Sequence, residues 1–166
     1  MSDAILNDEQ KENLWEGLLK KFQDTLPALK TLEDVFKQAI DLMADLPHFH
    51  WTGIYWLSDK NTLELFDYYK GLPTDHTRIP VGQGVCGTAV AENQDIIVDD
   101  VRGLDNYLAC SIGTRAEIVV LIRNPTNGDV LGQIDVDSDV VGAFNEVDRR
   151  YMELVAHKIA AVAQKN

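Results

Sequence analysis

The chain has 166 residues, about the size of one domain, and its hydrophobic fraction of 45% is ordinary for a globular protein. No apolar run approaches the ~18 residues that a membrane span needs, which excludes a membrane protein. With 15 Lys and Arg against 27 Asp and Glu, the formal net charge is −12. Such a surface repels phosphate groups, so neither a nucleic acid nor a membrane is expected as a partner.

The first residues of the chain do not resemble a secretory signal peptide. Residues 1–12 are polar and lack the apolar middle of a signal peptide, so we expect a cytoplasmic protein with a flexible polar N-terminus in a single domain over 1–166. The chain has two cysteines. In a reducing compartment they cannot form a disulfide framework, and by themselves they are too few for a zinc site. They are either small buried residues, which composition favours, or redox-active thiols.

Hydrophobic periodicity predicts helices and a hairpin in the first part of the chain. Apolar residues recur at helical spacing over residues 8–23. Thr31 is expected to cap a second helix, which Pro47 ends. Residues 51–57 and 62–69 are rich in β-branched and aromatic residues and predict the two strands of a hairpin.

The middle of the chain has weaker patterns. Residues 71–81 show no period and contain two prolines, which predicts an exposed loop. Residues 84–93 are compatible with a short helix and residues 96–98 with a short strand, and residues 99–114 are expected to be mostly loop.

The last part of the chain predicts a hairpin followed by a long helix. Strands are expected over 117–123 and 130–136, joined across Asn127-Gly128, and an amphipathic helix over 146–164. This order of elements predicts an α+β fold, an antiparallel sheet with helices packed on one face. The apolar stripes of the terminal helices either cover the sheet or form a dimer interface.

Three glycines, Gly82, Gly84 and Gly87, match the spacing G-x-G-x-x-G of dinucleotide-binding turns. That function requires a buried strand just before the glycines, whereas here only Ile79-Pro80-Val81 precedes them. We therefore reject a dinucleotide site. The glycines are expected to allow a tight turn and a close backbone approach at the start of the short helix.

The two cysteines occupy different surroundings. Cys86 is predicted near a helix N-terminus, where exposed amide groups would lower the pKa of its thiol; the alternative is a small residue that fills a turn. Cys110 lies 24 residues later in a polar loop, where a thiol has less reason to be part of a core. If the fold brings both sulfur atoms within disulfide reach, they form a redox couple.

Two carboxylates alternate along the last predicted strand. Asp135 and Asp137 are two residues apart, so they point to one face of the sheet, and Glu117 at the start of the neighbouring strand is placed to join them. Crowded carboxylates raise one another's pKa, which would leave one of them protonated near neutral pH. The alternative, which the residues alone favour slightly, is the solvent face of an edge strand.

Aromatic and histidine residues are less informative. Trp51 and Tyr55 share one face of a strand and belong either to the core or to the wall of a ligand site. His48, His50 and His76 have no metal-binding spacing, so solvated or capping roles are expected and no metal site is predicted.

Four motifs together resemble the free methionine-(R)-sulfoxide reductases, which are single GAF domains. The resemblance runs from about Leu14 to the end of the chain, and Trp51-x-Gly53-x-Tyr55 matches as well. The four motifs, in order, are Gly82-x-Gly84-Val85-Cys86-Gly87, Leu108-Ala109-Cys110, Glu117-Ile118-Val119-Val120 and Gly132-x-Ile134-Asp135-Val136-Asp137-Ser138.

The resemblance implies a GAF-like antiparallel six-stranded sheet with flanking N- and C-terminal helices, and a pocket that encloses free L-methionine (R)-sulfoxide. Trp51 and Tyr55 would then contact the substrate's methyl group. Glu117, Asp135 and Asp137 would surround its sulfoxide oxygen and amino group.

The same resemblance implies a reaction without a bound cofactor. One cysteine attacks the sulfoxide and becomes a sulfenic acid, the other condenses with it to a disulfide, and thioredoxin reduces the disulfide. Helix-end electrostatics favour Cys86 as the nucleophile, whereas the resemblance indicates Cys110. We expect Cys110, which lies nearer in sequence to Glu117.

The sequence departs from the family pattern at two positions. His76 stands where many members have a third cysteine, and Ser111 where aspartate is common, which affects the resolving step and a contact to the substrate amine. The alternative functions are a non-catalytic GAF module that senses a small molecule and, more weakly, a structural dimerisation protein.

Overall fold

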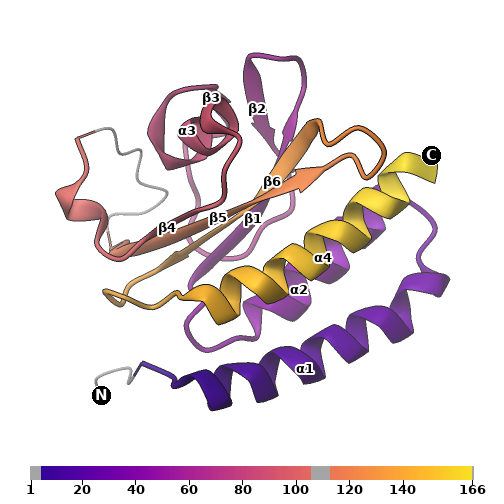
Figure 1. The fold of residues 1–166 in the computed structure, drawn as a ribbon, viewed down its shortest axis with the longest axis horizontal. Helices are drawn as coiled ribbons and strands as arrows, with labels where there is room; N and C mark the ends of the chain where they lie inside the picture. Colours follow the sequence, from indigo (N-terminus) through magenta and orange to yellow (C-terminus); the bar gives the residue numbers. More distant parts are fainter. Residues whose placement is uncertain (1–4, 106–112, 166) are drawn as a thin grey trace.

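An antiparallel six-stranded sheet forms the centre of the fold, seen in a computed structural model that describes residues 5–105 and 113–165 (Figure 1). The strand order is β3-β2-β1-β6-β5-β4, so β1, β6 and β5 are interior strands. This architecture is the GAF-like α+β sheet expected from the sequence. The strands are β1 (Trp51–Leu57), β2 (Thr62–Leu65), β3 (Arg78–Pro80), β4 (Ile96–Val98), β5 (Ala116–Arg123) and β6 (Val130–Ser138).

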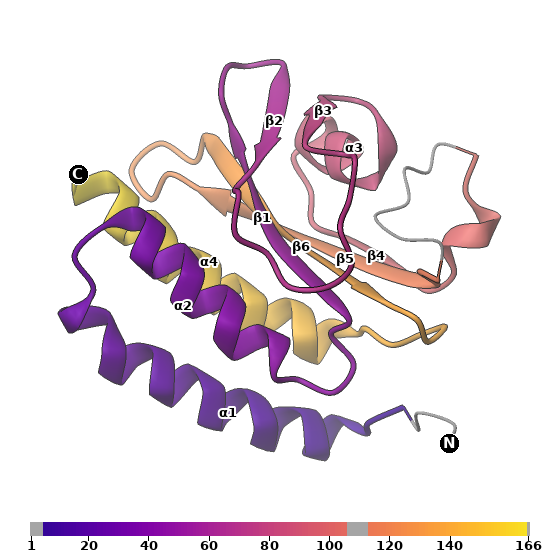
Figure 2. The ribbon, with the colours of Figure 1, turned by 180° about the vertical axis from the view of Figure 1, so that it is seen from behind.

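Helices lie on both faces of the sheet (Figures 1 and 2). The helices α2 and α4 contact the strands on one face, and α1 packs on α2 and α4 from outside. The prediction that all helices share one face is wrong for α3, whose apolar residues pack on the opposite face of the sheet. The α-helices are α1 (Asp8–Thr25), α2 (Leu32–Ala44), α3 (Gly84–Glu92) and α4 (Glu146–Lys165), and two 3-10 turns span Leu26–Ala28 and Val101–Gly103.

Capping boxes set the starts of the first two helices. The Asn7 side chain accepts a hydrogen bond from the backbone of Gln10, whose side chain accepts one from Asn7. The predicted cap Thr31 forms the same reciprocal pair with Asp34. The expectation of a flexible segment over residues 1–12 is therefore wrong from Asp8 onward, where the chain is already helical.

The strands also differ from those predicted from the sequence. The strand β2 ends at Leu65, four residues earlier than expected. The predicted loop 71–81 contains the three-residue strand β3, in which Pro80 pairs with Thr62. Proline is compatible with this position because β3 is an edge strand, which leaves one side of its backbone without a partner strand.

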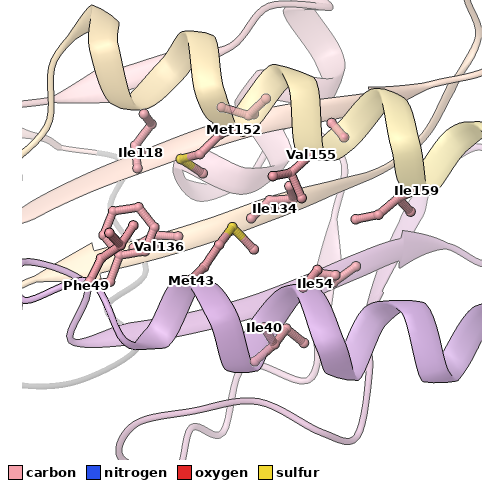
Figure 3. Close-up of a cluster of buried hydrophobic side chains, with 14 of the residues drawn as sticks. Ile40, Met43, Phe49, Ile54, Ile118, Ile134, Val136, Met152, Val155 and Ile159 are labelled. Atoms are coloured by element: carbon pink, nitrogen blue, oxygen red, sulfur yellow. The ribbon is translucent and has the colours of Figure 1, made fainter. Parts of the chain in front are cut away.

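The main hydrophobic core lies between the sheet and the pair α2 and α4 (Figure 3). On β6, Ile134 and Val136 point into this core, so the residues that alternate with them point to the other face. A shift of one residue would point the polar residues of β6 into this apolar core instead, and the core thereby holds the register of β6. The labelled core residues are Ile40, Met43, Phe49, Ile54, Ile118, Ile134, Val136, Met152, Val155 and Ile159.

A buried ion-pair network joins α1, α4 and the loop before β1. Asp148 on α4 accepts hydrogen bonds from the Lys11 ammonium and from Trp15 Nε1, the latter at 2.9 Å. His48 Nε2 lies 2.8 Å from Asp148 Oδ1, so the solvated or capping role expected for His48 is wrong. His50, in contrast, is partly exposed, and its Nδ1 accepts a hydrogen bond from the backbone of Asp139 in the loop after β6 at 2.8 Å.

The terminal helices meet within the chain. The rings of Trp15 on α1 and Tyr151 on α4 stack at 5.7 Å, and α4 in turn covers the sheet. A dimer through these helices stays a prediction. Over the described part of the chain, no helix combines the length and the apolar character needed to cross a membrane.

Candidate functional site

The sheet face that carries α3 holds a buried row of acidic residues. Glu117 on β5 pairs with Asp137 on β6, and Asp137 pairs with Trp51 on β1. Asp135 is two residues before Asp137 on β6, so it lies on the same face, and it pairs with Gly53 on β1. The three carboxylate residues are 2% (Glu117), 0% (Asp135) and 1% (Asp137) exposed. The alternative of a solvent face on an edge strand is therefore wrong, because β6 is interior and α3 packs over this face.

The thiol of Cys86 lies directly above this row. Cys86 is in the first turn of α3 and is 4% exposed, and its Sγ is 3.8 Å from Glu117 Oε2. Carboxylate oxygens of Glu117 and Asp135 and the Cys86 sulfur all lie within 4.8 Å of one another. Residues separated by up to 49 positions in the chain thus form one compact thiol and carboxylate cluster.

The electrostatics of the cluster favour a protonated glutamate. Burial raises the pKa of Glu117 well above its usual value, and the negative charges of Asp135 and Asp137 raise it further. A hydrogen bond with Asp135 acts in the same direction, whereas the one from Cys86 lowers the pKa. Glu117 is therefore suited to hold a proton near neutral pH and to give it to a bound molecule.

Glycine allows α3 to approach the sheet closely. A Cβ atom at Gly87 would lie 2.5 Å from the carbonyl oxygen of Pro80 and 2.9 Å from the backbone nitrogen of Gly82. Gly82 has a φ of +97°, and its amide donates to the Gly87 carbonyl at 2.9 Å. The glycine motif thus forms the tight turn and close approach that the sequence predicted.

Gln133 is a site residue that the sequence analysis did not single out. It is buried on β6, and its Nε2 donates to the carbonyl of Cys86 at 3.1 Å, which ties the first turn of α3 to the sheet. The period of two along β6 was an available signal, because it places Gln133 on the same face as Asp135 and Asp137.

The aromatic residues Trp51 and Tyr55 belong to the hydrophobic cluster on the same sheet face as the carboxylates. A Cβ atom at Gly53 would lie 2.5 Å from the Trp51 ring, so glycine makes the space for this indole. Trp51 Nε1 donates to the Leu72 carbonyl at 3.1 Å, and the Tyr55 hydroxyl donates to the His76 carbonyl at 2.7 Å. Both side chains therefore hold the loop before β3 against the sheet.

Two residues singled out in the sequence, Cys110 and Ser111, lie outside the described residues. The predicted meeting of the Cys86 and Cys110 sulfur atoms therefore stays a prediction. So do the catalytic and binding roles of Glu117, Asp135 and Asp137.

The sheet order, with helices on one face and a short helix over a polar site on the other, defines the class of protein. The chain belongs to the GAF domain family, whose model matches residues 30–163.

Relatives within this family carry two kinds of name. The free methionine-R-sulfoxide reductase of Escherichia coli is 39% identical over 131 residues, which cover 77% of this chain and 73% of that protein. Protein YtsP of Bacillus subtilis is 32% identical, covering 87% of this chain and 94% of that protein.

Solved structures with both a reductase name and a GAF sensor name also superpose on this chain. The type II free methionine-R-sulfoxide reductase of Thermoplasma acidophilum superposes with a TM-score of 0.73 at 31% identity, covering 81% of this chain and 96% of that one. A putative GAF sensor protein from Burkholderia vietnamiensis superposes with a TM-score of 0.84 at 28% identity, covering 93% of this chain and 96% of that one. The resemblance drawn from the four sequence motifs is confirmed.

Proposed function

We propose that this protein reduces free L-methionine (R)-sulfoxide to methionine by cysteine chemistry. The observation that supports this most directly is the buried thiol of Cys86, 3.8 Å from a Glu117 carboxyl whose pKa is strongly raised. Reduction of a sulfoxide needs a thiol and a proton donor for the departing oxygen. The E. coli relative, 39% identical, supplies the substrate class through its name.

The first step transfers the sulfoxide oxygen to a cysteine. The thiolate attacks the sulfoxide sulfur and forms an S–S bond while an acid protonates the oxygen. The oxygen then moves to the cysteine sulfur as the S–S bond and the S–O bond of the substrate break, which leaves methionine and a cysteine sulfenic acid. The substrate sulfur gains the two electrons that the cysteine sulfur loses. Glu117 is the proposed acid because its raised pKa leaves it protonated, and Cys110 is the proposed nucleophile.

The second step restores the thiols. The thiol of Cys86 attacks the sulfenic sulfur, a disulfide forms, and water leaves with the oxygen. Thioredoxin then exchanges its dithiol for this disulfide, so the cycle needs an external reductant and no bound cofactor. The cytoplasm, where thioredoxin keeps thiols reduced, is the expected location.

The charge of the site suits a free amino acid. Asp135 and Asp137 are buried carboxylate residues, and an ammonium group is the partner that balances such charge. A methionine sulfoxide within a polypeptide lacks this ammonium. Trp51 and Tyr55 lie on the same sheet face and are proposed to contact the methyl group.

A coupled assay tests the proposal. Purified protein with thioredoxin, thioredoxin reductase and NADPH should consume NADPH on addition of free methionine sulfoxide, and only the R epimer should react. Cys110→Ser should abolish turnover, whereas sustained turnover in that variant would assign the attack to Cys86. Mass spectrometry after one turnover should detect a disulfide between Cys86 and Cys110.

A sensor of a small molecule is the second candidate, favoured by the superposition on the Burkholderia GAF sensor protein at a TM-score of 0.84. A sensor would bind the amino acid and release it unchanged. Binding of methionine sulfoxide by calorimetry without formation of methionine would favour the sensor over the reductase.

A further inference from the structure

The cluster above the sheet contains a metal-binding set of donor atoms. Cys86 supplies a thiol sulfur, and Glu117 and Asp135 each supply a carboxylate oxygen, with all three atoms within 4.8 Å of one another. We propose that Cys86, Glu117 and Asp135 bind one thiophilic divalent cation of the zinc group, and that this cation inhibits the reaction. The inhibition rests on the proposed function, whereas the metal site does not.

The distances fit a tetrahedral site. With Zn–S near 2.3 Å and Zn–O near 2.1 Å, a tetrahedral angle separates the sulfur and oxygen ligands by about 3.6 Å. The Cys86 Sγ and Glu117 Oε2 atoms are 3.8 Å apart. The third ligand atom lies within 4.8 Å of the others, so it needs to move by at most about 1.2 Å, which a carboxylate rotation provides.

Gln133 gives independent support for a ligand at this place. Its Nε2 donates to the Cys86 carbonyl at 3.1 Å, which fixes the orientation of the amide and makes Oε1 the free acceptor. Gln133 is completely buried, and among the described residues no donor reaches this oxygen. A buried acceptor without a donor is costly. Since this amide contacts the backbone of the ligand residue Cys86, a ligand bound beside Cys86 is positioned to give Oε1 a partner.

The donor types select the kind of cation. Thiolate sulfur prefers zinc and similar soft ions, whereas magnesium and calcium need six or more oxygen ligands. On binding, the Cys86 S–H bond breaks and Glu117 gives up the proton that it holds, and both protons go to the buffer. One S–metal bond and two O–metal bonds form, with no change of oxidation state. The bound ion occupies the Cys86 thiol, which resolves the sulfenic acid in the proposed reaction, and the Glu117 acid, so it should block both roles.

A cadmium titration tests the site. The reduced full-length protein is titrated with CdCl₂, and the sulfur-to-cadmium charge-transfer absorption in the ultraviolet is followed. One equivalent of Cd²⁺ is expected to saturate the signal, and MgCl₂ should not displace it. Because the chain has two cysteines, the variants are decisive: Cys86→Ala should abolish the absorption and Cys110→Ser should retain it.

The carboxylate ligand has a matched control. Glu117→Gln should weaken Cd²⁺ binding by about tenfold or more, since even an outer-shell change costs ~10–100-fold in metal affinity. Glu92→Gln makes the same substitution at an exposed residue of α3 and should leave the affinity unchanged. Circular dichroism checks that each variant is folded. Absorption retained in Cys86→Ala, lost in Cys110→Ser, or unaffected by Glu117→Gln would overturn the site.

A single-turnover assay tests the inhibition. Reduced protein is mixed with methionine (R)-sulfoxide without thioredoxin, and the methionine formed is measured with and without one equivalent of CdCl₂. Because the metal takes the place of the proton on Glu117, it should lower the rate by about 100-fold or more, the usual contribution of a general acid. Methionine formed equally fast with cadmium bound would overturn the inhibition. No methionine in either sample would refute the proposed function instead, and the cadmium titration would still decide the metal site.

Discussion

The raised pKa of Glu117 affects both the free energy of unfolding and the proposed reaction. Burial first, and then the charges of Asp135 and Asp137, raise its pKa well above the usual value. The unfolded chain therefore loses this proton at a lower pH than the folded one. The stability that the group contributes is fully present below the unfolded pKa and is lost as the pH rises through the folded pKa.

The Glu117→Gln variant separates these two effects. Glutamine keeps the shape and cannot ionise, so unfolding in urea should show a smaller loss of stability at alkaline pH than the wild-type protein does. The proposed reductase activity should fall by about 10²–10⁴-fold, the usual contribution of a general acid. The exposed Glu92→Gln control should keep the wild-type pH dependence. An unchanged pH dependence in Glu117→Gln would contradict the raised pKa.

Asp148 is a buried residue with a different role. Burial raises its pKa, but hydrogen bonds from His48, Lys11 and Trp15 outweigh this effect and hold the pKa below its usual value. Its contribution to stability is therefore present above the unfolded pKa and is lost as the pH falls through the folded pKa. The network connects α1 and α4 on the face of the sheet opposite the site.

Replacement of Asp148 tests this network. Asp148→Ala leaves the Lys11 ammonium buried and uncompensated, so the free energy of unfolding should fall by about 3–5 kcal/mol. The exposed pair Lys20–Asp24 is the control, and Asp24→Ala should cost less than about 1 kcal/mol. Urea unfolding of both variants measures the difference. Equal small effects would show that Asp148 does not hold the helices together.

At the scale of elements, the approach of α3 to the sheet decides where the Cys86 thiol lies. The close contact at Gly87 involves backbone atoms of the turn after β3, which cannot move aside as a flexible side chain can. The Gln133 side chain holds the same turn of the helix from the sheet side. A larger residue at position 87 therefore has to displace the helix that carries the thiol.

A pair of glycine variants should have opposite effects. Gly87→Ala should destabilise the protein by about 1–3 kcal/mol and lower the proposed activity, because its Cβ meets the Pro80 carbonyl at 2.5 Å. Gly17→Ala, in the interior of α1 with nothing within 4 Å of its Cβ, should stabilise by about 0.5–1 kcal/mol. Urea unfolding and the coupled assay measure both. A neutral Gly87→Ala would mean that α3 is not held by this contact.

At the scale of the whole molecule, the two faces of the sheet have separate roles. The face with α2 and α4 holds the main hydrophobic core, and α1 lies outside them (Figure 1). The face with α3 holds the buried carboxylates and the thiol. The cost of burying these polar groups is offset by the large core on the other side of the same strands.

The net charge of −12 leads to a prediction about salt. Repulsion among like charges destabilises the folded chain, and exposed ion pairs contribute little in return. Moderate NaCl screens this repulsion and should raise the thermal midpoint by about 2–4 °C, which corresponds to about 1 kcal/mol. Calorimetry at low and moderate salt measures the shift. A midpoint that falls with salt would show that specific ion pairs outweigh the repulsion.

Local patterns were enough to predict much of the fold. The Thr31 cap, the strand Trp51–Leu57 and the shared face of Asp135 and Asp137 all follow from interactions between residues close in sequence. The strand β3 was missed because three residues ending in Pro80 give no recognisable period. His48 was misjudged because its partner Asp148 lies 100 residues away.

The sequence alone determines that Asp135 and Asp137 share one face of the sheet, because side chains alternate with a period of two along a strand. Whether that face meets water or protein depends on β1 and β5 flanking β6, and on α3 packing above them. Those contacts join distant parts of the chain. Burial, and with it the raised pKa of Glu117 beside the Cys86 thiol, is therefore a property of the assembled tertiary structure, because desolvation arises only when distant segments exclude water together.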